Sequence, residues 1–432
     1  MTQDDVFSRG KERLMSLDYS KQKLLVVGAG IGQMPLIHKA MAKGIHVTVV
    51  TVKGDYPAIE VADDCWFIDI YDRDAIVEKA REEGITAVIS DQNDLMMPTV
   101  AYIAEKLGLP GNRFDQVMSY CDKNTYRDNC DKLGNPVPKH IAVFDENMDL
   151  GSIEFPLPWI VKPSDSQSSI GVKRVDDLES AKEAIRFALA KSKTHSAIVE
   201  EFFKGKEIVC EGFIVDGKYH LLSFADRKYF DRDDVLIPCQ TLFPSNITKT
   251  LLDQVVSCEE KMADYIHPSF AIVHSEYLIN EETDEIRVVE SALRGGGVYI
   301  SSHLIPLATG LDINELVLSL ALGEDVDHEA FFASKQQKAS GYVCFYLPEG
   351  TITKISGVEE VTALPYVKMV ALVNIKVGLE TEPMTFKGSR KGPLLVCGED
   401  REDLEKKILQ IQDMLKIEVT APDGSIKGII WQ

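Results

Sequence analysis

An acidic turn at residues 281–285 separates two apolar stretches, and this arrangement predicts an antiparallel hairpin. In the register that this turn implies, Asn280 pairs with Ile286, and Glu276 lies opposite Glu290. Directly opposed residues have Cβ atoms about 4.5–5.5 Å apart, and like charges at that distance destabilise a hairpin. The two carboxylates therefore predict a bound cation or a shared proton, and Mg²⁺ takes one or two carboxylates together with substrate phosphates. An acid pair on an exposed hairpin face is the structural alternative.

Arg294 and three successive glycines, residues 295–297, come directly after the second predicted strand. A guanidinium group offers a planar fork of donors that matches a carboxylate or a phosphate. Glycines lack a Cβ atom, so the backbone can approach a ligand closely. We therefore expect the substrate acid to bind beside Arg294.

Lys162 stands at the end of a short apolar strand, where a rigid element holds its ammonium group. A cation in that position predicts a bound anion. The loop that follows is rich in small polar residues and glycine, whose N–H and hydroxyl groups suit phosphate oxygens. The candidate phosphate-binding residues in this loop are Ser164, Ser166, Ser168, Ser169 and Gly171. A serine-rich segment on its own is more often a solvated loop, which is the alternative.

Residues 199–207 run from an apolar strand into acids, aromatic residues and a turn. An adenine ring needs an apolar slot, an acceptor for its amino group and a backbone N–H for a ring nitrogen. The carboxylate of Glu207 suits the two ribose hydroxyls. The segment therefore predicts a nucleotide site, and an ordinary strand with a charged turn is the alternative.

A glycine-rich turn, GAGIG at residues 28–32, joins the first predicted strand to a helix. Such a turn lets the backbone approach a phosphate and is typical of NAD sites. However, Gln33 stands where the dinucleotide motif needs a glycine, and the next strand does not end in the acid that would bind ribose. An NAD-linked oxidoreductase is therefore a rival interpretation, and a tight strand-to-helix turn is favoured over it.

A polar run at residues 90–94 ends another strand of the N-terminal unit. Ligands of parallel sheets bind at the carboxyl ends of the strands, so these side chains are candidates for a substrate-side role. Helix capping by Asp91 or Asn93 explains the same residues. Both interpretations stay open at this point.

The formal charge of −21 would repel nucleic acid and anionic membranes, so neither is an expected partner. Any phosphate must then be bound locally by a few lysines, glycines and Mg²⁺, which favours a small nucleotide. The eight cysteines contain no C-x-x-C pair, so we expect neither zinc nor disulfides and take a reduced cytoplasm as the default. The polar N-terminus and the lack of a long apolar run predict no export signal and no membrane span.

The order of the predicted elements divides the chain into four units of α/β and α+β character. Strands that alternate with helices predict a Rossmann-like domain with a parallel sheet at residues 1–114. A smaller α+β unit, the lid, is expected at 115–205, and hairpins predict an antiparallel sheet at 206–335. Short strands and a helix form a small C-terminal lobe at 336–432.

In this order the segments resemble the ATP-grasp superfamily over residues 20–330, in the spacing of several motifs rather than in any one. The segments that carry the resemblance are CDKNTYRD (121–128), VKPSDSQSSIGV (161–172), VEEFFKGKE (199–207) and VVESALRGGG (288–297). The resemblance implies that Lys123 and Lys162 contact the phosphates of ATP. It also implies that Glu200 or Glu201, with the Phe203 backbone, binds adenine.

The same resemblance assigns ribose binding to Glu207 and metal binding to Glu276 and Glu290. The implied metal is Mg²⁺, which Mn²⁺ can replace. Arg294 would steady an acyl phosphate and act with Lys162 in catalysis. One departure stands out, since the family reads E-x-N at the second metal strand and this chain has Ala292 at the third position. The second Mg²⁺ is therefore in question.

The last hundred residues are similar to the C-terminal lobe of L-amino-acid ligases. This likeness implies an ATP-dependent ligase that activates a small carboxylate, such as an amino acid, as an acyl phosphate and couples it to an amine. A homodimer is plausible from the superfamily. The rivals are a bicarbonate-using carboxylase of the same superfamily and a nucleotide-binding protein with weakened catalysis, which the missing asparagine favours.

Overall fold

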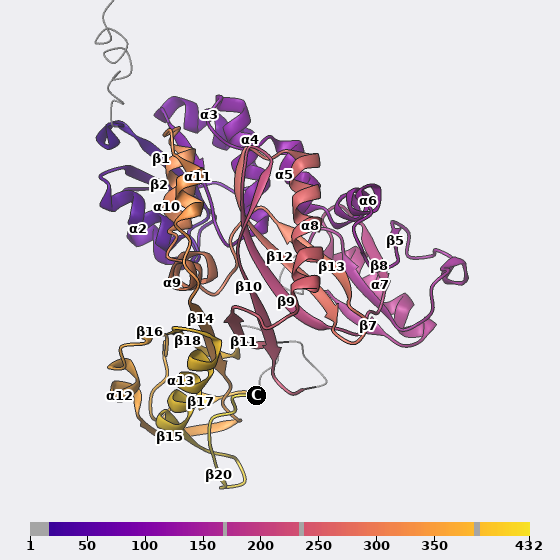
Figure 1. The fold of residues 1–432 in the computed structure, drawn as a ribbon, viewed down its shortest axis with the longest axis vertical. Helices are drawn as coiled ribbons and strands as arrows, with labels where there is room; N and C mark the ends of the chain where they lie inside the picture. Colours follow the sequence, from indigo (N-terminus) through magenta and orange to yellow (C-terminus); the bar gives the residue numbers. More distant parts are fainter. Residues whose placement is uncertain (1–16, 167–170, 233–236, 384–388) are drawn as a thin grey trace, which may run out of the picture.

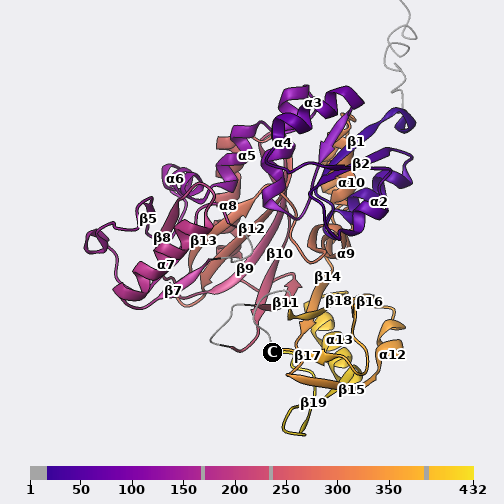
Figure 2. The same ribbon diagram turned by 180° about the vertical axis from the view of Figure 1, so that it is seen from behind.

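Four β-sheets organise the computed structural model, which describes residues 17–166, 171–232, 237–383 and 389–432. Figures 1 and 2 show the molecule from opposite sides, with the N-terminal sheet and the lid on either side of a central sheet. The C-terminal lobe lies at the far end from the N-terminal sheet. The expected mixture of α/β and α+β architecture is confirmed.

The N-terminal sheet has four parallel strands in the order β3-β2-β1-β4. Its strands are β1 (Lys23–Val27), β2 (His46–Thr51), β3 (Asp64–Phe67) and β4 (Ala87–Ile89). The buried residues of β1 alternate between two cores, because successive side chains of a strand point to opposite faces. One core contains α2 (Met34–Ala42) and α10 (Ile313–Ala321), and the other contains α3 (Arg73–Glu83) and α4 (Met97–Leu107).

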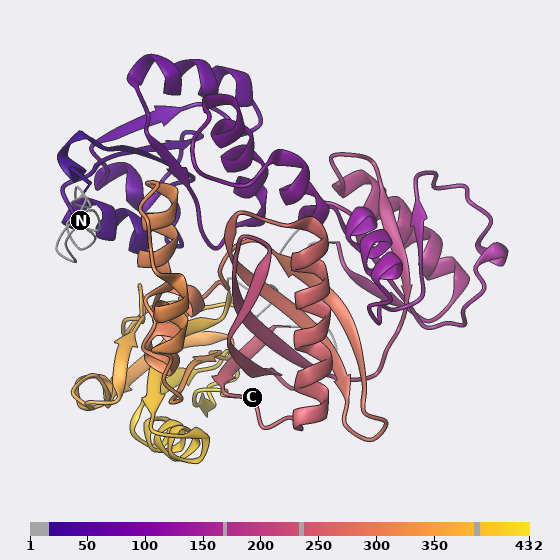
Figure 3. The same cartoon turned by 45° about the horizontal axis from the view of Figure 1, so that its top comes forward.

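Helices α5 (Phe114–Cys121) and α6 (Lys123–Leu133) lead from this domain into the lid. The lid is an antiparallel sheet in the order β5-β8-β6-β7, packed against α7 (Leu178–Lys191). Its strands are β5 (His140–Val143), β6 (Trp159–Pro163), β7 (Lys173–Val175) and β8 (Ala197–Glu201). Figure 3 shows the lid projecting from the side of the molecule.

The central sheet has eight strands in the order β13-β12-β9-β10-β11-β14-β18-β16. These strands are β9 (Lys206–Val215), β10 (Lys218–Tyr229), β11 (Pro238–Phe243), β12 (Phe270–Asn280), β13 (Glu285–Ala292), β14 (Ala339–Phe345), β16 (Val367–Val370) and β18 (Lys391–Gly398). Helix α8 (Lys249–Ile266) contacts β10 and β13. The sheet therefore continues past residue 335, because β14, β16 and β18 come from the last hundred residues.

The remaining C-terminal elements form a second antiparallel sheet in the order β17-β15-β19-β20. Its strands are β15 (Gly350–Ser356), β17 (Glu380–Thr381), β19 (Lys416–Thr420) and β20 (Ile426–Lys427). The other α-helices in the described ranges are α9 (Ile305–Thr309), α11 (His328–Ala333), α12 (Val358–Thr362) and α13 (Arg401–Met414). Residues of β14, β15, β18, β19 and α13 share one core, which fixes this lobe to the central sheet.

The hairpin of β12 and β13 sets Glu276 opposite Glu290, as expected. However, the pairing expected next to the turn is wrong. Asn280 pairs with Glu285 rather than with Ile286, because the turn is one residue shorter than expected. A bulge beside Tyr277 then restores the register before the strands reach the two glutamates. Two deviations of one residue therefore cancel.

No single helix in the described ranges is long and apolar enough to cross a membrane. One bent pair of helices, Ile300–Thr309 with Ile313–Ala321, is long and apolar enough for a membrane span when the two are taken together. The two helices are set at 120°, and both contribute residues to the core beside the N-terminal sheet.

Candidate functional site

Three of the candidate acids come from neighbouring strands of the central sheet, and two of them, Glu207 and Glu276, contact one cation, Arg227 of β10. Its NH1 atom is 2.6 Å from Glu207 of β9 and also pairs with Glu276 of β12. Glu290 of β13 stands opposite Glu276 on the far side. Arg227 was not among the expected site residues. Strands β9 and β10 form a hairpin, but a bulge between Leu221 and Ser223 shifts their register, and the sequence does not reveal this shift.

The charges around Arg227 set the protonation of the two acids that it contacts. Burial alone would raise the pKa of Glu276, but Arg227 and His274 outweigh burial and hold this pKa well below its ordinary value. Burial raises the pKa of Glu207, and the nearby Glu276 carboxylate adds to the rise while Arg227 opposes it. Glu207 also accepts a hydrogen bond from the hydroxyl of Tyr229. One acid therefore stays ionised, and the other takes up a proton more readily than usual.

A buried His274–Glu211 pair supports the same end of the sheet. Nδ1 of His274 contacts Glu211, and its Nε2 is 3.5 Å from Glu276. Burial alone would lower the pKa of His274, but Glu211 outweighs burial and raises it. Both residues were missed from the sequence. The alternation of β12 could have identified His274, since it lies two residues before Glu276 and so on the same face.

Lys162 is held inside the lid by an ion-pair network that reaches the central sheet. Its Nζ atom lies 2.7 Å from one oxygen of Glu200, and Nε of Arg127 lies 2.7 Å from the other. Arg127 of α6 also donates to the Val289 carbonyl oxygen at 2.6 Å, one residue before Glu290. Burial lowers the pKa of Lys162, and Arg127 and Lys123 lower it further, while Glu200 opposes the change. Arg127 therefore ties the lid to the strand that carries Glu290.

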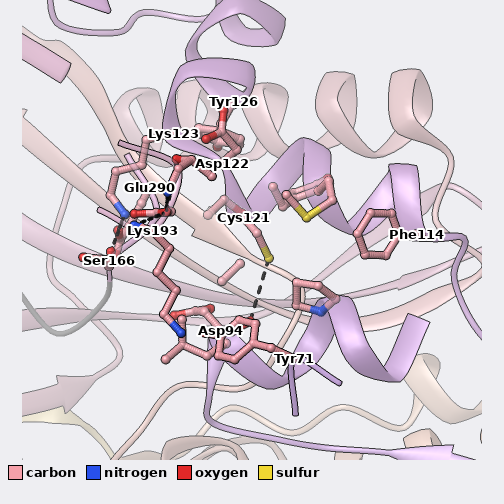
Figure 4. Close-up of a pocket in the computed structure, with 18 of the residues that line it drawn as sticks. Tyr71, Asp94, Phe114, Cys121, Asp122, Lys123, Tyr126, Ser166, Lys193 and Glu290 are labelled. Carbon is pink, nitrogen blue, oxygen red and sulfur yellow. Dashed lines mark hydrogen bonds and ion pairs between the residues drawn. The ribbon is translucent and has the colours of Figure 1, made fainter. Parts of the chain in front are cut away.

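Lys123, the first residue of α6, joins the other side of the lid to the same strand. Its Nζ atom donates to the Ser166 carbonyl oxygen at 2.8 Å and lies 3.5 Å from Glu290. Figure 4 shows Lys123 between Glu290 and Ser166. The structure therefore brings the two expected phosphate lysines to the neighbourhood of Glu290, because both belong to networks that end on β13.

Among the described residues, the other candidates of the lid loop make no hydrogen bond with Glu290. Ser164 is buried and its hydroxyl contacts that of Ser196, while Gly171 adopts φ +79° next to the Pro163 ring. Such a φ favours glycine. Ser168 and Ser169 lie outside the described residues.

The two acids expected at the adenine site have different surroundings. Glu200 is 4% exposed, and both of its oxygens are engaged by Arg127 and Lys162. Glu201 is only half-buried and accepts a hydrogen bond from the Lys139 N–H at 3.1 Å. The Arg287 guanidinium lies 4.7 Å from the centre of the Phe203 ring. Glu200 therefore positions Lys162, and Glu201 is left as the candidate beside Phe203.

Arg294 binds the polar run that ends β4. Its Nε and NH2 atoms form a two-pronged contact with Asp94, at 2.8 and 2.9 Å. The neighbouring Asp91 accepts hydrogen bonds from the Gly295 N–H and the Ser301 hydroxyl, each at 2.7 Å. Asn93 caps the short helical turn that follows by accepting from the Leu95 N–H. Capping is thus confirmed for Asn93, whereas Asp91 and Asp94 hold the arginine–glycine segment against the N-terminal domain.

The glycine segment offers a matched pair of substitutions. At Gly295 an added Cβ would lie 2.2 Å from the Cβ of Ser301, whereas at Gly297 it would meet nothing within 4 Å. We expect Gly295→Ala to lower the free energy of unfolding by about 1–3 kcal/mol through overpacking, and Gly297→Ala to change it by less than about 0.5 kcal/mol. Urea denaturation measures both. Equal effects would contradict the close packing around Gly295.

The N-terminal glycine turn is closed by its own helix. The Gln33 side chain accepts a hydrogen bond from the Gly30 N–H at 3.0 Å and donates to the Asp91 carbonyl oxygen at 2.6 Å. Its oxygen would lie 3.2 Å from a Cβ atom at Gly28, so it covers the turn. A side chain therefore takes the place where a dinucleotide phosphate would approach the backbone, which favours the tight turn over NAD binding.

The acids of the central sheet suit Mg²⁺ by their chemistry. Carboxylate oxygens are the hard donors that this ion prefers, and it usually completes its shell with phosphates and water. Among the described residues, no three or more histidines, cysteines, aspartates or glutamates gather closely enough to hold a metal ion by themselves. Glu276 and Glu290 therefore fit a site in which a nucleotide supplies further ligands.

Three family models match the chain. They are an ATP-grasp N-terminal domain at residues 37–111, an ATP-grasp domain at 155–302 and the L-amino acid ligase C-terminal domain 2 at 343–420. Residues 37–111 and 155–302 therefore match the two ATP-grasp domains that the sequence motifs indicated. The C-terminal match lies with the L-amino acid ligases, which confirms the expected likeness of the last hundred residues.

Individual proteins agree with this assignment. Alanine–anticapsin ligase from Bacillus subtilis (strain 168) is 28% identical over 283 residues, which are 58% of this chain and 57% of that protein. The match to D-alanine–D-alanine ligase from Azobacteroides pseudotrichonymphae is 27% identical over 38% of this chain and 52% of that protein. The chain therefore spans about half the length of these two relatives. The structure of an L-amino acid ligase from Bacillus licheniformis superposes with a TM-score of 0.76 at 22% identity, covering 92% of this chain and 98% of the other. This likeness establishes the fold.

Proposed function

We propose that the protein is an ADP-forming carboxylate–amine ligase, which activates a small carboxylic acid, such as an amino acid, with ATP and couples it to an amine. The observation that carries the proposal is the convergence of Lys123, Lys162 and the Glu276–Glu290 pair at one end of the central sheet. Cations from the lid and acids from the sheet are the groups that phosphoryl transfer needs, since its catalysis depends on positioning and charge neutralisation. The family matches and the ligase relatives support the same reaction class.

In the proposed reaction, a carboxylate oxygen attacks the γ-phosphorus of ATP, and the bond to the β-phosphate oxygen breaks so that ADP leaves. The amine nitrogen then attacks the acyl carbon, phosphate leaves, and the nitrogen loses a proton to solvent. Lys123 and Lys162 bind phosphate oxygens, and Glu207 binds the ribose. Bound Mg²⁺, held by Glu276 and Glu290, supplies charge neutralisation at the phosphates.

The arginine–glycine segment and the lid have supporting roles in this proposal. Arg294 lies next to the acyl phosphate and is held in place by Asp94. The lid closes over the intermediate, because an acyl phosphate exposed to water would hydrolyse. A cytoplasmic location and a homodimer also belong to the proposal, and the eight free thiols agree with a reducing compartment.

Release of ADP, measured over a panel of acids and amines with ATP and Mg²⁺, tests the proposal. We expect ADP to form only when a carboxylic acid and an amine are both present, and mass spectrometry should detect their amide. ADP release that depends on bicarbonate would favour the carboxylase. Binding of ATP with no turnover over the whole panel would favour the nucleotide-binding protein, which Ala292 in the metal strand supports.

A further inference from the structure

A cavity of about 330 Å³ lies beside Glu290, where the N-terminal domain, helices α5 and α6, the lid and strand β13 meet. This volume is at the lower end of the range for small-molecule pockets, about 300–1,000 Å³. Much of its wall is apolar and aromatic. The side chains that form this part include Leu95, Pro98, Phe114, Met118, Tyr126 and Ala292.

One end of the cavity is polar and coincides with the proposed reaction centre. Lys123, Ser166 and Glu290 line it there, and Figure 4 shows these three side by side. Asp94, which holds Arg294, also lines the cavity. Figure 4 places Phe114 well away from Lys123 and Glu290. A ligand with a charged head and an apolar body would therefore fit with its head at Lys123 and Glu290. The Arg73 guanidinium, 5.0 Å from the centre of the Phe114 ring, is a further cation on the cavity wall.

We propose that this cavity binds the apolar side chain of the carboxylate substrate, so that the protein selects acids with a bulky aromatic or branched side chain. The inference rests on the proposed function, because that function places phosphoryl transfer beside Lys123 and Glu290. The molecule that fills the cavity presents its head group at that end. The carboxylate that receives the phosphoryl group is therefore the head of the molecule in the cavity.

Ala292 gives the cavity room at the end near the reaction centre. It lies two residues after Glu290 on β13, so the two side chains point to the same face of the sheet. Ala292 is 8% exposed, and its methyl group lines the cavity. A larger side chain at this position would occupy space that the substrate takes, so the change from the usual asparagine enlarges the pocket.

The lid closes one side of the cavity through contacts with the N-terminal domain. Nζ of Lys193 lies 3.2 Å from the centre of the Tyr71 ring, which is a cation–π contact. The carboxylate of Asp165 accepts hydrogen bonds from the N–H groups of Lys193 and Thr194, both at 2.9 Å. All four residues line the cavity. The cavity is thus shaped by both domains, and a substrate within it contacts the lid.

Hydroxamate formation tests the inference, because hydroxylamine traps only the acid that has been activated. The wild-type protein is incubated with ATP, Mg²⁺, hydroxylamine and one of four acids: L-phenylalanine, L-leucine, L-alanine or glycine. We expect kcat/KM for the two bulky acids to exceed that for glycine by at least about tenfold, since each buried methylene contributes about 10–200-fold to discrimination.

Two variants reduce the cavity from two different elements. Met118→Trp acts from α5, and Ala292→Leu acts from β13. In each variant we expect the ratio of kcat/KM for L-phenylalanine to that for glycine to fall at least about tenfold. Met414→Trp, at the end of α13 in the C-terminal lobe, is the matched control and should keep the wild-type ratio. The two separate walls keep the test informative if one variant does not fold.

The outcomes separate this inference from the proposed function. Wild-type preference for glycine or L-alanine, or an unchanged ratio in the folded cavity variants, would overturn the inference and leave the ligase proposal intact. Amide products that carry the bulky residue only as the amine component would also overturn it. Failure of every acid to give a hydroxamate would instead contradict the ligase function, and the inference with it.

Discussion

Glu290→Gln should lower ATP turnover at least about a hundredfold, the size of loss expected when one preorganised charge at a reaction centre is removed. Glutamine keeps the size of the side chain but removes the charge that faces Glu276 and Lys123. Stability should change little, because the Glu290 side chain is 33% exposed and its partner lies 3.5 Å away. Steady-state ADP release and thermal unfolding measure the two effects separately.

Glu285→Gln is the control for this variant. Glu285 begins the same strand but has an exposed side chain, remote from the lid lysines. Its substitution should leave ADP release within about twofold of wild type. Near-normal turnover in Glu290→Gln would remove Glu290 from the proposed metal site.

Glu200→Gln should lower the free energy of unfolding by about 3–5 kcal/mol, because it leaves two buried cations without their carboxylate. Arg127 is 1% exposed and Lys162 is 5% exposed, so water cannot replace the lost charge. Chemical denaturation at neutral pH measures the difference. Glu201→Gln is the matched control on the next, half-buried residue and should cost less than about 1 kcal/mol.

The cost of Glu200→Gln should also depend on pH. Burial alone would raise the pKa of Glu200, but Arg127 and Lys162 lower it from the ordinary 4.5 to about 2. A carboxylate with a depressed pKa in the folded state stabilises the fold above its unfolded pKa and loses this contribution as the pH falls toward the folded pKa. The difference from wild type should therefore be constant above about pH 5 and shrink between pH 4.5 and 2. A difference that grows on acidification would contradict the ion-pair network.

Local patterns were enough to predict the hairpin that carries Glu276 and Glu290, because both strands and the turn lie within one short segment. The register was reached through two deviations that cancel, since neither turn length nor a bulge can be read reliably from apolar alternation. Short strands were predicted in the C-terminal segment, but it was not predicted that three strands of this segment join the central sheet. Of these strands, β14 pairs with β11, which lies about a hundred residues earlier, and short apolar strands do not reveal distant partners.

The same limit applies to the site. Lys123, Lys162 and Glu207 stand in short motifs and could be selected from the sequence. Arg227 and Glu211 could not be, because each meets its partner only through strand pairing or packing across the sheet. Arg127 had a weak local signal, since it lies four residues after Lys123 and so on nearly the same face of α6.

The continuity of the central sheet across residue 335 has a consequence for engineering this chain. Strand β11 is buried along its whole length and is hydrogen-bonded on one side to β14. A cut between the two segments would expose the edge of β11, and an uncovered apolar edge invites pairing with other chains. Exchange of C-terminal lobes between related ligases should therefore transfer β14, β16 and β18 together with a compatible β11. The unit to exchange is therefore the shared sheet, whose strands come from both sides of residue 335.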